Sequence, residues 1–290
     1  MKPVNAMTVD VEDYFQVSAF EQQVSRESWE RTETRVAANM DRILALFDEQ
    51  NVKATFFTLG WVAERHPDMV RQIVDGGHEL ASHGWQHTRA TQQTPQEFRD
   101  DVRRTKHTLE DLSGLAVNGY RAASYSIGAS NLWALDVLAD EGYAYSSSIA
   151  PIRHDLYGMP EAPRCAFEAA DGRLTEIPVT TVRLLGRNIN CGGGGWFRLF
   201  PYAFSRWALR HINTREARSA HFYFHPWEID PAQPRVEGVS ARTRLRHYLN
   251  LERMEDRLRS LLRDFDWDRM DRVYADEIAK TRGLESRASA

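Results

Sequence analysis

Short apolar runs of strand length alternate with segments of helical periodicity along most of this chain. The first run covers residues 4–11, a segment with one apolar face follows from Thr34, and a second strand-like run begins at Val52. The alternation recurs about six or seven times, which predicts a mainly parallel sheet covered by helices. We therefore expect an α/β fold, a parallel barrel that is either complete or open. One domain is expected over residues 1–270, including a C-terminal packing helix. A C-terminal tail follows over residues 271–290, and its last dozen residues are expected to be frayed.

The composition excludes several classes of partner. The chain has 290 residues, of which 42% are hydrophobic and 27% charged, and its net charge of -4 gives no electrostatic reason to bind nucleic acid or an anionic membrane. No stretch resembles a signal peptide or reaches the ~20 apolar residues of a transmembrane helix, so a cytoplasmic protein is expected. Cys165 and Cys191 are too few for a disulfide framework or a cysteine-based zinc site. The composition indicates no particular oligomeric state.

Local signals predict several helix ends and one loop. Thr94 and Glu97 predict a capping box that starts a helix, which Gly114 ends. Ser130 is expected to cap the next helix. The run of glycines within residues 190–200 lacks the pattern of a nucleotide-binding loop. We interpret it as a flexible loop near a sugar site, with a plain turn as the alternative.

Two histidines and a group of acids carry the strongest chemical signal. His83 and His87 are four residues apart, a spacing that puts both imidazoles on one face of a helix or helical turn. Asp10, Glu12 and Asp13 lie at the end of the first predicted strand, where α/β folds place their chemistry. Two imidazoles and one carboxylate are typical ligands of a divalent metal. Zinc is the expected ion, and such a site also accepts cobalt or nickel.

Five motifs resemble those of a known family. They are DVEDYF from Asp10, TFFTLGWVAERHP from Thr55, GHELASHGWQH from Gly77, YRAASYSI from Tyr120 and YFHPWEIDPAQPRV from Tyr223. In this order and spacing they make the chain similar to the polysaccharide deacetylases of the NodB-homology type, carbohydrate esterase family 4. The branch found beside exopolysaccharide and PEP-CTERM systems is the most similar. The resemblance covers most of residues 4–265. It implies an α/β fold of the NodB type, an irregular (β/α) barrel of about seven strands, which agrees with the alternation described above.

The resemblance also implies a role for each matching residue. His83 and His87 would bind a divalent metal together with a carboxylate from Glu12 or Asp13. Both acids stay open, because Asp13 joins the side of the strand that carries Asp10 and Glu12 only if the strand has already turned. Asp10 would be the catalytic base, and Arg121 the arginine that orients it. His225 would be the general acid. Tyr125 and Trp227 would contact the substrate. A backbone N–H near Tyr125 is expected to stabilise the oxyanion.

Two positions depart from the family pattern. Relatives commonly carry proline at the position of Ala123 and aspartate at that of Ser146. The serine removes the carboxylate that is expected to hold His225 in its working tautomer. Three other acids could replace this carboxylate, and the sequence does not choose among Asp155, Glu176 and Glu228.

The predicted function is a metal-dependent hydrolase that removes N-acetyl groups from amino sugars of an exopolysaccharide or its precursor. Its partner is then an N-acetylated saccharide. An allantoinase-like or cyclic-imide amidohydrolase would use a similar metal site on small amide rings. A catalytically impaired saccharide-binding protein is the alternative from a different class, suggested by Ser146.

Overall fold

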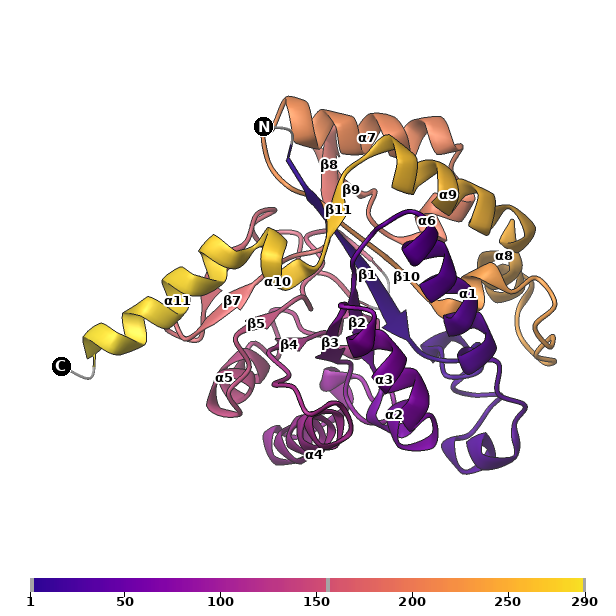
Figure 1. The fold of residues 1–290 in the computed structure, drawn as a ribbon, viewed down its shortest axis with the longest axis horizontal. Helices are drawn as coiled ribbons and strands as arrows, with labels where there is room; N and C mark the ends of the chain where they lie inside the picture. Colours follow the sequence, from indigo (N-terminus) through magenta and orange to yellow (C-terminus); the bar gives the residue numbers. More distant parts are fainter. Residues whose placement is uncertain (1–2, 155–156, 289–290) are drawn as a thin grey trace.

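The computed structural model describes residues 3–154 and 157–288, with side chains as far as residue 281 (Figure 1). A curled sheet of nine strands forms its centre, in the order β10-β1-β2-β3-β4-β5-β7-β6 with β11 paired to β1, and β8 and β9 form a separate hairpin. The strand bounds are β1 Asn5–Val11, β2 Thr55–Thr58, β3 Glu79–Ser82, β4 Gly119–Tyr120, β5 Tyr145–Ser146, β6 Phe167–Ala169, β7 Leu174–Glu176, β8 Thr181–Leu184, β9 Arg187–Asn190, β10 His221–Phe224 and β11 Trp267–Asp268.

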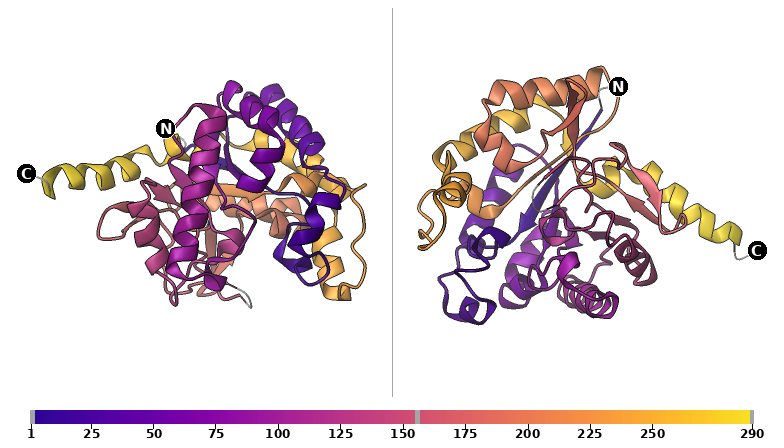
Figure 2. Two further views of the ribbon diagram at one scale, coloured as in Figure 1. Left: turned by 90° about the horizontal axis from the view of Figure 1, so that it is seen from below. Right: turned by 180° about the vertical axis from the view of Figure 1, so that it is seen from behind.

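Parallel pairing dominates this sheet. Neighbouring strands from β10 through β1 to β7 pair in parallel, and β6 runs antiparallel to β7 at one edge. Helices surround the curled sheet, as the two further views also show (Figure 2). The predicted fold class, an irregular α/β barrel, is confirmed in the form of a half-barrel.

Helices connect most of the parallel strands and cover the sheet. The α-helices are α1 Val36–Glu49, α2 Gly60–Arg65, α3 Pro67–Asp75, α4 Pro95–Ser113, α5 Trp133–Asp140, α6 Gly194–Leu199, α7 Tyr202–Thr214, α8 Ala241–Tyr248, α9 Met254–Asp264, α10 Met270–Val273 and α11 Ala275–Ala288. The 3-10 helices are η1 Ser18–Phe20, η2 Arg26–Arg31, η3 Ala90–Gln92, η4 Ala123–Tyr125, η5 Pro226–Ile229 and η6 Leu251–Arg253. Across the described ranges, no helix combines the length and apolarity that crossing a bilayer requires.

Buried apolar stripes hold the helices on the sheet. In α1 the predicted face is buried, with Val36, Met40, Ile43 and Phe47 each 1% exposed or less. Burying one such side chain contributes about 1.5–3 kcal/mol to the stability of the fold. The helix therefore forms where the sequence predicts it, because its apolar spacing matches one side of the helix.

The capping signals of α4 are confirmed. The Thr94 hydroxyl accepts the N–H of Glu97 at 3.3 Å, and the Glu97 carboxylate accepts the N–H of Thr94 at 2.8 Å. Gly114 follows the helix in the left-handed conformation, with φ 69°. These contacts are local, which is why the sequence alone predicts both ends.

The predicted cap of α5 is wrong. Ser130 does not cap the helix, which begins at Trp133 after Leu132 and has no side-chain cap. Asn131 instead closes the preceding turn, since its side-chain oxygen accepts the N–H of Gly128 at 2.9 Å. The helix therefore starts later than the serine suggests.

The flexible loop predicted for residues 190–200 is also wrong. The first glycines pack against β10, where the N–H of Tyr223 donates to the carbonyl of Gly192 at 2.7 Å. A β-carbon at Gly193 would lie 2.6 Å from the Tyr223 ring, so only glycine permits this approach. From Gly194 the chain continues as α6. The glycines are needed for close packing rather than for mobility.

The segment expected as a C-terminal tail is helical up to residue 288. It contains most of α10 and all of α11, which extends outward beside β7 (Figure 1). The hydroxyl oxygens of Thr281 and Thr175 lie 2.6 Å apart, which ties α11 to β7. The domain boundary at residue 270 stays a prediction.

Candidate metal centre and active site

Four of the parallel strands end next to a predicted site residue. Asp10 lies near the end of β1, His83 follows β3, Arg121 follows β4 and His225 follows β10. Because these strands lie within the run β10-β1-β2-β3-β4, their carboxyl ends meet on one side of the sheet. The topology therefore brings residues from the first, middle and last parts of the chain to one place.

Glu12, His83 and His87 form the candidate metal centre. Their ligand atoms lie within 4.8 Å of one another, and all three residues are buried. Nε2 of His87 is 3.0 Å from a carboxylate oxygen of Glu12, and the two imidazole rings are 5.3 Å apart. Two nitrogens and one carboxylate leave further coordination positions open, which is typical of a catalytic metal site.

The protonation states and hydrogen bonds of these three residues suit the binding of a divalent cation. Nδ1 of His83 donates to the carbonyl of Arg121 at 2.8 Å, which leaves the Nε2 lone pair for a ligand bond. Burial lowers the pKa of His83 to about 4, so its ring is neutral at pH 7. Burial raises the pKa of Glu12, but the nearby His87 and His225 outweigh burial and hold this pKa at about 2. Oε2 of Glu12 is buried without an aligned hydrogen-bond donor among the described residues.

The spacing of His83 and His87 predicts that they share a helix or helical turn, and this prediction is wrong. Residues 83–87 lie outside any helix, and Gly84 and His87 have φ 75° and 55°. N–H groups at the start of α2 donate to the carbonyls of Gly84 and Trp85 at 3.0 and 2.9 Å. Two left-handed residues held by these bonds fold the segment back on itself, so tertiary contacts bring the imidazoles together.

Asp13, the other candidate ligand, is directed elsewhere. Its carboxylate accepts the N–H groups of Tyr14, Arg35 and Val36 at 2.9, 2.7 and 3.0 Å. Asp13 thereby satisfies donors at the start of α1, and it is absent from the cluster of possible ligands. Burial raises its pKa to about 6 against these hydrogen bonds. Of the two acids left open by the sequence, Glu12 is the one beside the imidazoles.

Asp10 is paired with the predicted arginine. Nη1 of Arg121 donates to Oδ1 of Asp10 at 2.5 Å and to the Thr8 hydroxyl at 2.9 Å. Arg121 is fully buried, and its Nε also donates to the carbonyl of Ser147 at 3.3 Å. These contacts fix the guanidinium of Arg121. The other carboxylate oxygen of Asp10, Oδ2, lies 3.9 Å from Nε2 of His225.

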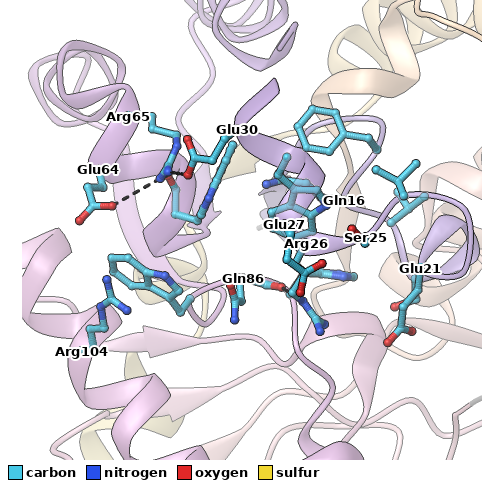
Figure 3. Close-up of a pocket in the computed structure, with 18 residues that line it drawn as sticks. Gln16, Glu21, Ser25, Arg26, Glu27, Glu30, Glu64, Arg65, Gln86 and Arg104 are labelled. Atoms are coloured by element: carbon cyan, nitrogen blue, oxygen red, sulfur yellow. Dashed lines mark hydrogen bonds and ion pairs between the residues drawn. The ribbon is translucent and has the colours of Figure 1, made fainter. Parts of the chain in front are cut away.

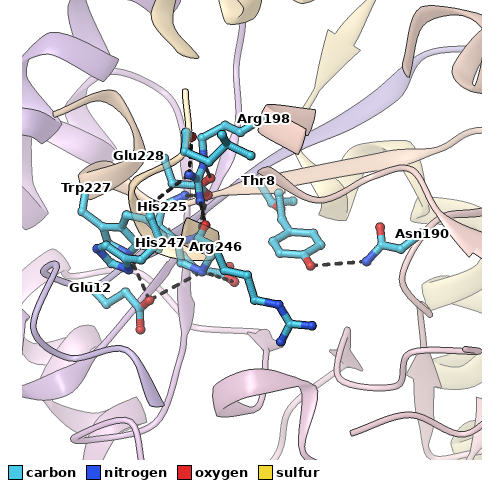
Figure 4. A network of polar contacts seen from close by, with 12 residues as sticks. Thr8, Glu12, Asn190, Arg198, His225, Trp227, Glu228, Arg246 and His247 are labelled. Carbon is cyan, nitrogen blue, oxygen red and sulfur yellow. Dashed lines mark hydrogen bonds and ion pairs between the residues drawn. The ribbon is translucent and has the colours of Figure 1, made fainter. Parts of the chain in front are cut away.

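His225 lies between two carboxylates (Figure 4). Its Nδ1 is 2.8 Å from Oε1 of Glu228, and its Nε2 is 3.5 Å from Oε1 of Glu12. Burial lowers the pKa of His225, but Glu12, Glu228 and Asp10 outweigh burial and raise it to about 9. The Trp227 ring stacks on His225 at 5.1 Å, and its indole N–H donates to Glu12 at 3.3 Å.

The structure distinguishes the acids that could replace the missing aspartate. The Ser146 hydroxyl lies 2.8 Å from that of Ser148. Oε1 of Glu176 accepts the N–H groups of Ser148 and Ile149, both at 2.8 Å, and so supports a loop rather than the histidine. Asp155 lies outside the described residues. Glu228 is therefore the acid that the structure places beside the imidazole.

A cavity of about 350 Å³ opens onto the candidate site. Its walls include Asp10, Glu12, His83, His87 and His225. The sequence predicts Tyr125 and Trp227 in this cavity, but it does not predict five further wall residues from the loop before β6, from β10 and from α8, namely Tyr157, Tyr223, Thr243, Arg246 and His247. Tyr223 begins one of the quoted motifs, whereas the other four carry no motif, and only the tertiary fold brings their segments over the site.

The backbone N–H of Tyr125 is engaged within its own segment, where it donates to the carbonyl of Ala122 at 3.0 Å. The oxyanion donor expected near Tyr125 stays a prediction. Ser124 and Tyr125 both have left-handed backbones, with φ 54° and 52°. This uncommon conformation directs Tyr125 into the cavity wall, where it packs against Tyr223 at 4.9 Å.

Figure 3 shows a second cavity, of about 760 Å³. The two share Val17, Ser18 and His87. Labelled charged residues from the segment before α1 and from α2 and α4 line it, including Arg65 and Arg104. The two cavities together give the candidate site an extended approach rather than a closed pocket.

The half-barrel and its buried cluster define the chain as an α/β protein with a candidate metal centre at the carboxyl ends of its strands. Residues 30–146 match the model of the family "Polysaccharide deacetylase", and residues 147–275 match a "Domain of unknown function (DUF3473)". Residues 30–146 thus form a polysaccharide deacetylase domain, the family that the motifs predict.

Curated relatives match a part of the chain. A peptidoglycan deacetylase of Helicobacter pylori is 31% identical over 108 residues, which are 37% of this chain and 36% of the relative. A peptidoglycan-N-acetylglucosamine deacetylase of Bacillus cereus is 36% identical over 75 residues, 26% of this chain and 27% of the relative. The chain thus spans about a third of these relatives or less.

A solved structure matches nearly the whole fold. It comes from a Mycobacterium smegmatis protein named as a polysaccharide deacetylase, with a TM-score of 0.59 and 19% identity. The match covers 98% of this chain and 95% of the other. At this identity the likeness concerns the fold alone.

Proposed function

We propose that the protein is a metal-dependent hydrolase that removes N-acetyl groups from amino sugars of an exopolysaccharide or its precursor. The observation that carries this proposal is the convergence of a possible metal centre with Asp10 and His225 in one cavity. The names of the curated relatives support the reaction class, since both are named as deacetylases of peptidoglycan. The exopolysaccharide substrate rests on the sequence resemblance.

Glu12, His83 and His87 would hold the metal, with zinc expected first and cobalt or nickel as alternatives. When bound, such an ion supplies Lewis-acid polarisation of the acetyl carbonyl and a lowered pKa of water. The hydrogen bond from His83 to the carbonyl of Arg121 fixes the tautomer that a ligand bond needs.

Asp10 acts as the base in this proposal. Its Oδ1 is held by Arg121, so Oδ2 is left to accept a proton from the attacking water. The guanidinium makes further bonds to Thr8 and Ser147, which keep it from swinging into the cavity. Arg121 thus orients the carboxylate for proton transfer.

His225 acts as the proton donor to the leaving amine. Its Nε2 faces Asp10 and Glu12 while its Nδ1 is engaged by Glu228, so one ring nitrogen is presented to the substrate. An amine leaves poorly without a proton, and a placed general acid typically speeds such a step about 10²–10⁴-fold.

The cavity walls suit a saccharide. Tyr125, Tyr157, Tyr223 and Trp227 present aromatic rings, which can pack against the apolar faces of sugar rings. Arg246 from α8 points toward the same space (Figure 4). We take Tyr125 and Trp227 as substrate contacts, as the sequence predicted.

The proposal is tested by acetate release. The metal-loaded protein should liberate acetate from oligomers of N-acetylglucosamine, and chelation or His83→Ala should abolish it. Turnover of hydantoin or allantoin in place of the oligomer would favour the amidohydrolase alternative, and sugar binding without turnover would favour the binding-protein alternative. Acetate release that survives both chelation and His83→Ala contradicts the metal centre.

A further inference from the structure

The region that matches a domain of unknown function contributes to the site itself. The polysaccharide deacetylase model ends at residue 146, whereas His225 lies within residues 147–275. We propose that this region completes the catalytic site, and that Glu228 and Arg198 are positioning residues that hold His225 as proton donor. The inference rests on the proposed function.

Glu228 is attached to His225 through two contacts. Its Oε1 lies 2.8 Å from Nδ1 of the ring and 3.1 Å from the backbone N of the same residue, which donates to it. Both residues belong to one short segment, η5 and the residue before it, and Glu228 is fully buried. A carboxylate that binds both the ring and the backbone of its partner fixes the imidazole rotation and keeps the proton on Nδ1.

Arg198 holds the other oxygen of this carboxylate. Its Nε donates to Oε2 of Glu228 at 2.6 Å, and its Nη1 donates to the carbonyls of His247 and Leu249 at 2.9 and 2.7 Å. Arg198 is 2% exposed, so the ion pair is removed from water. A buried carboxylate needs such a partner, because an unpaired charge in this position is strongly unfavourable. The arginine therefore fixes Glu228, and Glu228 fixes His225 (Figure 4).

The glycine run admits this carboxylate. A β-carbon at Gly194 would overlap both carboxylate oxygens of Glu228, whereas one at the adjacent Gly195 would meet nothing within 4 Å. Gly194 also begins α6, the helix that carries Arg198. The α6 segment thus provides both the space for the Glu228 carboxylate, at Gly194, and the cation that holds it, Arg198. This explains why the glycine run has a glycine at position 194.

The position of the carboxylate ties the two regions together. On β5 the residue Ser146 offers a hydroxyl, bonded to Ser148, where a carboxylate was expected. The carboxylate beside His225 comes instead from η5, in the second region. The first region supplies His83, His87 and Arg121, and the second supplies the donor and its support. Asp10 and Glu12 come from β1 and the residue after it, ahead of both regions. Neither region contains a complete set.

The proton balance of the reaction requires this arrangement. Water adds to the acetyl carbon and gives one proton to Asp10, and the C–N bond then breaks as His225 gives its Nε2 proton to the amine nitrogen. The ring left behind is neutral and retains its Nδ1 proton against Glu228. The products are acetate and a free amine, with no oxidant or further reactant. Loss of Glu228 should therefore slow the step that expels the amine.

The test compares two adjacent glycines. We expect Gly194→Ala and Glu228→Gln each to lower kcat on oligomers of N-acetylglucosamine about 10²-fold, the size of a general-acid contribution. Gly195→Ala is the matched control and should keep the wild-type kcat. KM and metal content should stay within about twofold in all three, because neither the metal ligands nor Trp227 is changed. Gly194→Ala should add little to Glu228→Gln, because both act through the same carboxylate.

Two results would overturn the inference. One is a wild-type kcat in a folded Glu228→Gln protein, and the other is a loss of metal parallel to the loss of kcat. A measurement independent of turnover is the side-chain ¹⁵N spectrum of His225, assigned with His225→Gln. The Nδ1 signal should change in Glu228→Gln and Gly194→Ala but not in Gly195→Ala. An unchanged Nδ1 signal in these two variants refutes the positioning role even if no substrate is turned over. If the signal changes in the variants but the wild-type protein releases no acetate, the positioning role stands and the proposed function is rejected.

Discussion

Replacing Asp13 by alanine should destabilise the fold and leave metal binding intact. The carboxylate accepts N–H groups from Tyr14, Arg35 and Val36 and is 1% exposed. Losing three such bonds in a buried place, at about 1 kcal/mol each, should lower the free energy of unfolding by about 3 kcal/mol. For a chain of this size that corresponds to a fall in Tm of roughly 5–10 °C.

The assay is urea unfolding of chelated protein at pH 8, above the Asp13 pKa of about 6, combined with a metal titration. Asp13→Asn keeps one acceptor oxygen and should lose less stability than Asp13→Ala. Glu12→Gln is the matched variant, and it should weaken metal binding at least about tenfold, because it removes an anionic ligand. The reasoning is refuted if Asp13→Ala weakens metal binding as much as Glu12→Gln does, or if it leaves the unfolding free energy unchanged.

Three further predictions concern other groups. Burial and the charge of Asp271 raise the pKa of Glu79 to about 8, so the stability gained from its protonated form is complete below about pH 4.5 and is lost as the pH rises toward 8. Glu79→Gln should flatten the fall of the unfolding free energy with rising pH, measured by urea unfolding at a series of pH values. An unchanged dependence of the unfolding free energy on pH would contradict this prediction. Arg121→Lys should lower kcat more than about tenfold at unchanged metal content, since a single ammonium cannot hold both Asp10 and its other partners. Trp227→Phe removes the donor to Glu12 and should weaken metal binding about tenfold, measured by competition with a chelator, and equal affinity would show that this bond does not support the ligand.

Local interactions explain what the sequence predicted correctly. The capping box of Thr94 and Glu97 lies within one helical turn, and the apolar face of α1 follows from residue spacing. The order of strands and helices follows from the same periodicities, and it predicts the half-barrel because parallel strands need helical crossovers. Asp10 and His83 could be placed near one another for the same reason, since both lie at carboxyl ends of strands.

Long-range contacts explain what the sequence could not predict. The turn that carries His87 depends on backbone bonds to α2, so its helical interpretation from spacing alone failed. The glycine run depends on Glu228 and Tyr223, which come later in the chain and require the close approach. The choice between Glu12 and Asp13 depended on where the chain turns after β1, and that turn is fixed by the start of α1.

The most direct test of the account is an anomalous-difference map of crystals grown with zinc, collected at the zinc absorption edge. We predict one strong peak bonded to Glu12, His83 and His87, with Asp13 retaining its contacts to α1. A map without a peak at this place, or a peak bonded to Asp13 instead of Glu12, would contradict the metal centre on which the proposed hydrolase depends.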